Sequence, residues 1–203
     1  MTATGKIELM APAGNFESMQ AALDNGCDSI YFGVEQLNMR ARATVNFVLD
    51  DLPEIARRCN EKNVRTYLTL NTIIYDHDLS IVKTLLTKAK EAGITAVIAS
   101  DQAVIMTARS IGMEVHISTQ LNVTNIETVK FYAMFADTIV LSRELSLRQV
   151  KKITDEIEKE QVKGPSGNLV EIEIFGHGAL CMAVSGKCYL SLHSHNSSAN
   201  RGA

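Results

Sequence analysis

The chain has 203 residues, of which 46% are hydrophobic and 21% are charged, and its formal net charge at pH 7 is −3. This composition allows one sizeable core and excludes a strongly basic chain that binds nucleic acid through bulk charge. No apolar run approaches the length of a membrane span, and the N-terminus lacks the apolar region of a secretory signal. We therefore expect a protein of the cytoplasm with no membrane partner.

Short β-rich apolar runs alternate along the chain with longer amphipathic ones. The runs that we expect to form strands are residues 7–11, 29–34, 65–70, 96–99, 114–118, 138–142 and 170–175. The expected helices are residues 15–25, 51–62, 78–92, 101–111, 125–135 and 146–160, each with apolar residues at three- and four-residue spacing. This order predicts a parallel sheet with helices outside it.

Two parallel architectures fit that order, a doubly wound open sheet and a closed barrel. The first strand is not followed by G-x-G-x-x-G, the mark of a dinucleotide-binding open sheet. Polar residues instead follow nearly every strand, as they do at the mouth of a (β/α) barrel of the TIM type. We count seven strands, so we expect residues 1–203 to be one incomplete barrel domain, the N-terminal part of a longer protein, whose eighth strand lies beyond the C-terminus. The unclosed edges could allow self-association.

The segment after the seventh strand carries the strongest chemical signal. Cys181 and Cys188 are separated by six residues that include a flexible Ser-Gly, so both thiols can converge on one metal. Structural zinc and iron–sulfur clusters usually take four ligands, so two cysteines alone are too few. On spacing alone, they could equally be ordinary buried or loop thiols.

Other polar residues at the strand ends are candidates for substrate binding. Arg40 and Arg42 suit a phosphate or carboxylate, or else hold their loop. The remaining candidates are Asn71, Gln120, Asn122, Arg143 and His177. Arg143 with Glu144 could be an internal ion pair or an active-site couple. His116 lies within a strand, where a core residue with satisfied hydrogen bonds is the more frequent interpretation. No nucleophile–base pair can be assembled, so the catalytic residues stay unknown.

The run from Glu173 to Ser191 resembles the signature of the collagenase-like peptidases, the unassigned-peptidase family 32. Glu173, Phe175, Gly178, Cys181, Gly186, Cys188 and Ser191 stand at the signature positions, and further matches run from Glu8 to Leu145. The resemblance implies a barrel and, for several members, a 4Fe-4S cluster held by four cysteines, of which Cys181 and Cys188 match two. The family pattern Asn-Arg-Gly-x-Cys reaches only Ala203 in this chain, just before the third ligand.

The same resemblance implies two kinds of activity. The family label is peptidase, a hydrolase of unassigned catalytic type, whereas other members take part in prephenate-dependent tRNA hydroxylation, ribosomal RNA hydroxylation or ubiquinone hydroxylation. We expect an iron–sulfur enzyme that hydroxylates RNA or a small molecule, because a redox centre at the barrel mouth could carry out the redox chemistry of hydroxylation. The alternatives are a collagenase-like protease and an inactive binding or assembly fragment.

Overall fold

The computed structural model describes residues 7–35, 37, 47–178, 181–189, 191, 193, 196 and 198–201. Its strands are β1 (Met10–Pro12), β2 (Ser29–Phe32), β3 (Arg65–Leu70), β4 (Ala96–Ala99), β5 (Glu114–Ile117), β6 (Thr138–Val140) and β7 (Glu171–Glu173). Its helices are α1 (Phe16–Asp24), α2 (Leu52–Glu61), α3 (Leu79–Ala92), α4 (Gln102–Ser110), α5 (Ile126–Ala133) and α6 (Leu147–Glu160). Short 3-10 helices are η1 (Leu49–Asp51), η2 (Asp76–Asp78), η3 (Thr119–Leu121) and η4 (Ala199–Arg201).

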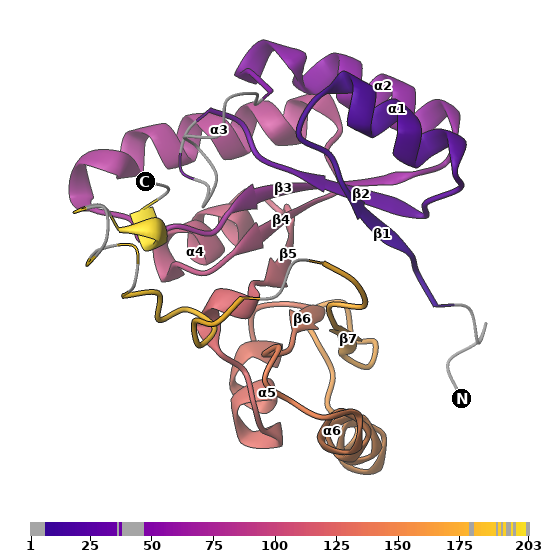
Figure 1. The fold of residues 1–203 in the computed structure, drawn as a ribbon, viewed down its shortest axis with the longest axis vertical. Helices are drawn as coiled ribbons and strands as arrows, with labels where there is room; N and C mark the ends of the chain where they lie inside the picture. The colour runs from indigo at the N-terminus through magenta and orange to yellow at the C-terminus, as the bar shows by residue number, and fades with distance from the viewer. Residues whose placement is uncertain are drawn as a thin grey trace.

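The seven strands form one sheet in the order of the chain, and every neighbouring pair is parallel. The sheet curls and the helices lie on its outer side, which leaves a concave inner face, the lumen (Figure 1). An open doubly wound sheet would reverse its strand order at one point, and this sheet does not. The predicted TIM-type barrel, incomplete with seven strands, is therefore confirmed. Within the described residues, the edge strands β1 and β7 each have a single strand neighbour.

The side chains of each strand alternate between two hydrophobic clusters. In β3, Leu68 and Leu70 point outward and are fully buried in the main core, under the helices. Tyr67 points the other way and forms a smaller lumen cluster with Ala96 and Ile98. Because burial of apolar area stabilises a fold by about 25 cal/mol per Å², the outer cluster supplies most of the hydrophobic stabilisation. The lumen is left for more polar chemistry.

The helix boundaries follow local capping chemistry. Asn15 caps α1, because its Oδ1 accepts a hydrogen bond from the Ser18 backbone N–H at 2.7 Å. Asp101 caps α4 in the same manner, accepting from the Ala103 N–H at 2.8 Å. Gly93 ends α3 in the left-handed region, at φ 87°. The predicted helix bounds at residues 15, 92 and 101 agree with these starts and stops to within one residue.

Several strands are shorter than predicted at their carboxyl ends. The second strand ends at Phe32 and not at residue 34, and the sixth at Val140 and not at residue 142. Beyond those points the backbone leaves the ladder, and only isolated bridges continue it, from Val34 to Phe47 and from Leu141 to Val123. Among the described residues, no helix is both long and apolar enough to cross a bilayer.

Candidate functional site

The carboxyl ends of β3 to β7 gather five of the predicted substrate-binding residues on one face. Asn71, Gln120 and Asn122 are half-buried there, whereas Arg143 and His177 are exposed. The loops that follow these strands all open on the same end of a parallel barrel, so residues far apart in sequence share one surface. Arg40 and Arg42 lie outside the described residues.

Asn122 has a structural task at this face. Its backbone is left-handed, with φ 53°, and its Oδ1 accepts a hydrogen bond from the buried Ser142 hydroxyl at 2.6 Å. This bond ties the loop after β5 to the end of β6. Arg143 lies next to it with its guanidinium carbon 5.8 Å from the centre of the Phe175 ring. Arg143 interacts electrostatically with Glu144, whose hydrogen bonds are made to Ser185.

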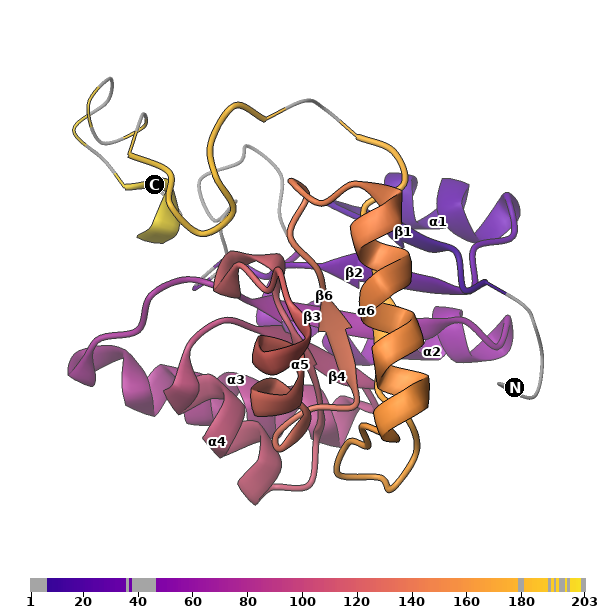
Figure 2. The same cartoon turned by 90° about the horizontal axis from the view of Figure 1, so that it is seen from below.

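Residues 174–201, here called the cysteine segment, follow β7 and cross the carboxyl face. Figure 2 shows this segment passing above the upward-pointing end of β6 and continuing to the C-terminus. Cys181 is exposed and Cys188 is half-buried, with its Sγ 3.6 Å from the Ser191 hydroxyl. The thiols therefore sit on the face where barrel enzymes bind their substrates.

A buried serine fixes the middle of the cysteine segment, and we call this contact the serine anchor. The Ser185 backbone N–H donates to Glu144 Oε1 at 2.8 Å, and its hydroxyl lies 3.1 and 3.2 Å from the two carboxylate oxygens. Burial alone would raise the pKa of Glu144, but these hydrogen bonds outweigh it and lower the pKa. Glu144 therefore remains an anionic acceptor for Ser185 near neutral pH.

Gly186, the next residue, touches the loop after β5. Its φ is 74°, and a Cβ added there would overlap the carbonyl oxygen of Gln120. Only glycine allows both the left-handed backbone and this close approach. Gln120 therefore acts at this face at least partly through its backbone, which supports the cysteine segment.

The arginine anchor holds the end of the segment. Arg201 Nη1 donates to Asp78 Oδ2 at 2.7 Å and to the Ile73 carbonyl at 2.6 Å, and the Asn200 carbonyl accepts from the Ile73 N–H at 3.0 Å. Asp78 is 5% exposed. Burial opposes its ionisation, but hydrogen bonds from the Tyr75 N–H and Arg201 lower its pKa. Asp78 directly precedes α3, in agreement with the predicted helix start at residue 78, but its side chain makes no cap hydrogen bond to that helix and instead holds Arg201, 123 residues away.

The donor set for a metal is half of what a four-cysteine cluster requires. Cys181 and Cys188 are on the carboxyl face, whereas Cys27 and Cys59 are buried, and Cys27 precedes the amino end of β2 on the opposite side of the sheet. Burial raises the pKa of Cys59 to about 11, which disfavours the thiolate that metals bind. The described residues contain no group of three or more His, Cys, Asp or Glu that could hold a metal ion. These residues alone do not fit a 4Fe-4S cluster.

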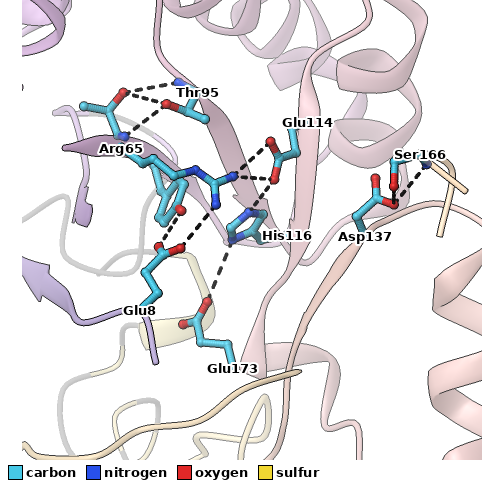
Figure 3. Close-up of polar contacts among 10 residues, drawn as sticks. Glu8, Arg65, Thr95, Glu114, His116, Asp137, Ser166 and Glu173 are labelled. Atoms are coloured by element: carbon cyan, nitrogen blue, oxygen red, sulfur yellow. Dashed lines mark hydrogen bonds and ion pairs between the residues drawn. The ribbon is translucent and has the colours of Figure 1, made fainter. Parts of the chain in front are cut away.

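A charged layer that was not predicted lies inside the lumen, formed by residues on or beside every odd-numbered strand. Figure 3 shows Glu8, Arg65, Glu114, His116 and Glu173 converging from β1, β3, β5 and β7. Arg65 Nη2 donates to both Glu114 oxygens at 2.9 and 3.2 Å, and Arg65 Nη1 donates to Glu8 Oε2 at 3.2 Å. The Tyr67 hydroxyl donates to Glu8 Oε1 at 2.6 Å.

His116 is the most buried member of this layer. Its side chain is 3% exposed, its Nε2 lies 3.1 Å from Glu114 Oε1, and its Nδ1 lies 3.8 Å from Glu173 Oε2, too far for a hydrogen bond. Burial disfavours the imidazolium, but contact with the two carboxylates outweighs burial and raises the pKa of His116. The expectation of a satisfied core residue is therefore only half right: Nε2 is paired and Nδ1 is not.

Spacing could have revealed the layer. Arg65 with Tyr67, and Glu114 with His116, are two residues apart within strands, so each pair must share one face. The histidines with a side-chain pairing in the described residues contact carboxylates, His116 as above and His77 at 3.4 Å from Asp78. A nucleophile would also need to contact the imidazole, and the contacts of His77 and His116 among the described residues include no serine or cysteine.

The model of peptidase family U32 matches residues 14–203. A collagenase of Porphyromonas gingivalis is 56% identical over 196 residues, which make up 97% of this chain and 47% of the relative. A tRNA hydroxylation protein of Bacillus subtilis is 31% identical over 202 residues, 98% of this chain and 45% of the relative. A 23S rRNA 5-hydroxycytidine synthase of Escherichia coli is 33% identical over 198 residues, with coverage of 97% and 28%.

The chain thus spans about half the length, or less, of these curated relatives. The solved structure of a U32 peptidase matches with a TM-score of 0.59 at 13% identity, covering 86% of this chain and 70% of that one. At this identity the likeness shows the fold alone, and it agrees with the curled parallel sheet.

Proposed function

Because this chain belongs to peptidase family U32, we propose that the protein takes part in prephenate-linked hydroxylation of RNA, either tRNA or ribosomal RNA. In this proposal Cys181 and Cys188 are two of the four ligands of a 4Fe-4S cluster. Because the chain spans about half the length of its relatives, the other two ligands would come from elsewhere in a longer protein. When bound, such a cluster supplies electron transfer.

One observation carries the proposal: the cysteine segment is held across the barrel mouth by anchors on either side of Cys188. The serine anchor fixes it to the loop after β6, and the arginine anchor fixes it to the loop after β3. A metal site needs ligands held in place by surrounding hydrogen bonds. The anchors provide such support, whereas a loop of two ordinary thiols would have no need of it.

The residues around the segment suit an anionic or polar substrate. Arg143 and His177 are exposed on the same face, and we propose that they contact the substrate, together with Asn71 and the Gln120 side chain. We also propose that Arg40 and Arg42 bind a phosphate, because guanidinium groups pair bidentately with phosphate oxygens.

Anaerobic reconstitution of the longer protein with iron and sulfide tests the ligand assignment. We expect Cys181→Ser and Cys188→Ser each to lose iron, sulfide and the visible absorbance of the cluster. Cys27→Ser is the matched control, since Cys27 is buried away from this face. Unchanged iron content in both variants would remove these cysteines from the ligand set.

Nucleoside mass spectrometry tests the reaction. RNA from a strain that lacks the gene should lose a hydroxylated nucleoside, and the wild-type gene should restore it. Restoration by the Cys181→Ser gene at the wild-type level would contradict a role for the cluster in hydroxylation.

A second candidate is a collagenase-like peptidase, which the 56% identical relative named collagenase favours. Against it, no serine or cysteine contacts His77 or His116 among the described residues, so neither histidine is paired with a nucleophile there. Incubation of the purified longer protein with gelatin, with and without divalent metals, tests this candidate. Cleavage that is lost in a single-residue variant would establish it.

A further inference from the structure

The exposed aromatic side chains are concentrated on the carboxyl face. Four aromatic residues count among the exposed large hydrophobic residues of the described chain: Tyr75, Phe131, Phe175 and Tyr189. Three of them follow β3 or β7 on the loops of this face, and only Phe131 lies on a helix, α5. Large rings cost free energy when they are left in water, so their collection around the cysteine segment suggests a ligand.

The first ring group is on the loop after β3. Tyr75 is 52% exposed, and the His77 ring stacks on it with centroids 5.8 Å apart and planes at 16°. The Arg201 guanidinium carbon lies 4.5 Å from the centre of the Tyr75 ring. The His77 ring and the Arg201 guanidinium therefore both lie against the Tyr75 ring, and about half of Tyr75 stays exposed, next to the exposed carboxylate of Asp76.

The second ring group is at the beginning of the cysteine segment. Phe175 is 51% exposed, with the Arg143 guanidinium on its face. Between this group and the first, the chain passes through Cys181 and Cys188 and crosses the barrel mouth (Figure 1). The two ring groups therefore flank the proposed reaction centre along the chain.

We propose that Tyr75 and Phe175 are stacking platforms for unpaired bases of an RNA substrate, one on each side of the cysteine segment. This inference rests on the proposed function and specifies its substrate as single-stranded RNA, such as a loop. Aromatic rings and guanidinium planes stack on every base, whereas paired bases in a helix offer no free face. Asp76 would repel phosphate beside Tyr75, so that platform fits a base better than the sugar–phosphate backbone.

A protein partner would also use aromatic residues and arginine, but it would need a continuous apolar patch. The segment between the two groups alternates exposed apolar side chains, such as Met182 and Val184, with exposed polar ones, such as His177 and Lys187, so its apolar surface is interrupted. Separate rings, each with its own cation, match successive bases of an extended strand better than one apolar surface.

Fluorescence anisotropy with dye-labelled RNA tests the platforms in the 203-residue chain. We expect the wild type to bind a stem-loop more tightly than a duplex of equal length. Loss of one stacked base costs about 1–3 kcal/mol, so Tyr75→Leu and Phe175→Leu should each weaken stem-loop binding roughly 5- to 100-fold. Because stacking involves no phosphate charge, this loss should persist at higher salt.

The matched control is Phe131→Leu, an equally exposed ring on α5, which should bind as the wild type does. Tyr75→Phe and Phe175→Tyr keep the ring and should retain affinity, and melting temperatures should show that all variants are folded. The inference is overturned if the two leucine variants bind the stem-loop as tightly as the wild type does, or if Phe131→Leu loses as much affinity as they do. It is also overturned if the wild type binds the duplex as tightly as the stem-loop, or binds neither RNA. Nucleoside mass spectrometry tests the proposed function separately. It measures whether RNA is hydroxylated, and that result does not depend on which residues stack the base.

Discussion

Replacing His116 by glutamine should remove a pH-dependent part of the stability of the fold. The contacts of His116 with Glu114 and Glu173 raise its pKa above the ordinary value of 6.5. A group whose pKa is higher in the folded state stabilises the fold fully below its unfolded pKa. That contribution is lost as the pH rises through the folded pKa. The stability of the wild type relative to the variant should therefore fall as the pH rises from about 6 through the raised pKa of His116.

The magnitude follows from the geometry of the Nε2 contact. His116 is nearly fully buried, and a hydrogen bond between charged groups contributes about 1.5–3 kcal/mol. We expect His116→Gln to lower the free energy of unfolding by about that amount near pH 6, and by less once the pH exceeds the raised pKa of His116. Glu8 and Glu114 have lowered pKa values despite burial, because of their hydrogen bonds and cationic neighbours. Their contribution is lost only as the pH falls through those values, below 4.5, in a separate window.

Urea unfolding of wild type and variant at a series of pH values measures the difference directly. His77→Gln is the matched control, because its side chain is 74% exposed and lies outside the lumen layer. A difference between wild type and His116→Gln that is constant over the window, or that grows as the pH rises, would refute the reasoning.

Three further predictions concern the anchors of the cysteine segment. Gly186→Ala should displace the segment and increase its cleavage by a trace of protease, because a positive φ alone costs a non-glycine residue about 1–2 kcal/mol. The control is Gly178→Ala, which has open space around it and should be cleaved at the wild-type rate; equal cleavage of the two variants would contradict the prediction. Glu144→Gln should weaken the serine anchor by about 1 kcal/mol, seen as roughly fivefold faster hydrogen exchange of the Ser185 amide; an unchanged rate would contradict that anchor. Asp78→Asn should lower the free energy of unfolding by about 1–3 kcal/mol and free the C-terminal residues; unchanged protease sensitivity there would show that the arginine anchor is dispensable.

Local patterns were sufficient to predict most of the fold. The third and fourth strands have the predicted bounds, and all six helices end within two residues of expectation. These elements have strong periodicity and clear caps, such as Asn15 and Asp101. The strand ends were harder to predict, because Leu141 and Ser142 are as apolar or buried as strand residues but leave the ladder to form the loops of the mouth.

The candidate site was only partly predictable. The cysteines, Arg143 and His177 were assigned to the carboxyl face because the (β/α) order requires it. Neither the serine anchor nor the arginine anchor could be predicted, because 41 and 123 residues separate their partners and neither pair has a local pattern. The charged lumen layer was missed for another reason: its strands read as ordinary apolar runs, and only assembly of the sheet brings Glu8 and Glu173 to one histidine.

The lumen layer also has a consequence for folding. If β5 paired one residue out of register, Val115 and Ile117 would face the lumen, and Glu114 and His116 would enter the apolar layer beneath the helices. Arg65 would then lose its bidentate partner, and two charged groups would be buried without compensation. A lumen of uniform aliphatic side chains would tolerate such a slip far better. The layer therefore discriminates against misaligned strands, a contribution to the uniqueness of the native pairing that a stability measurement on the correctly folded protein does not reveal.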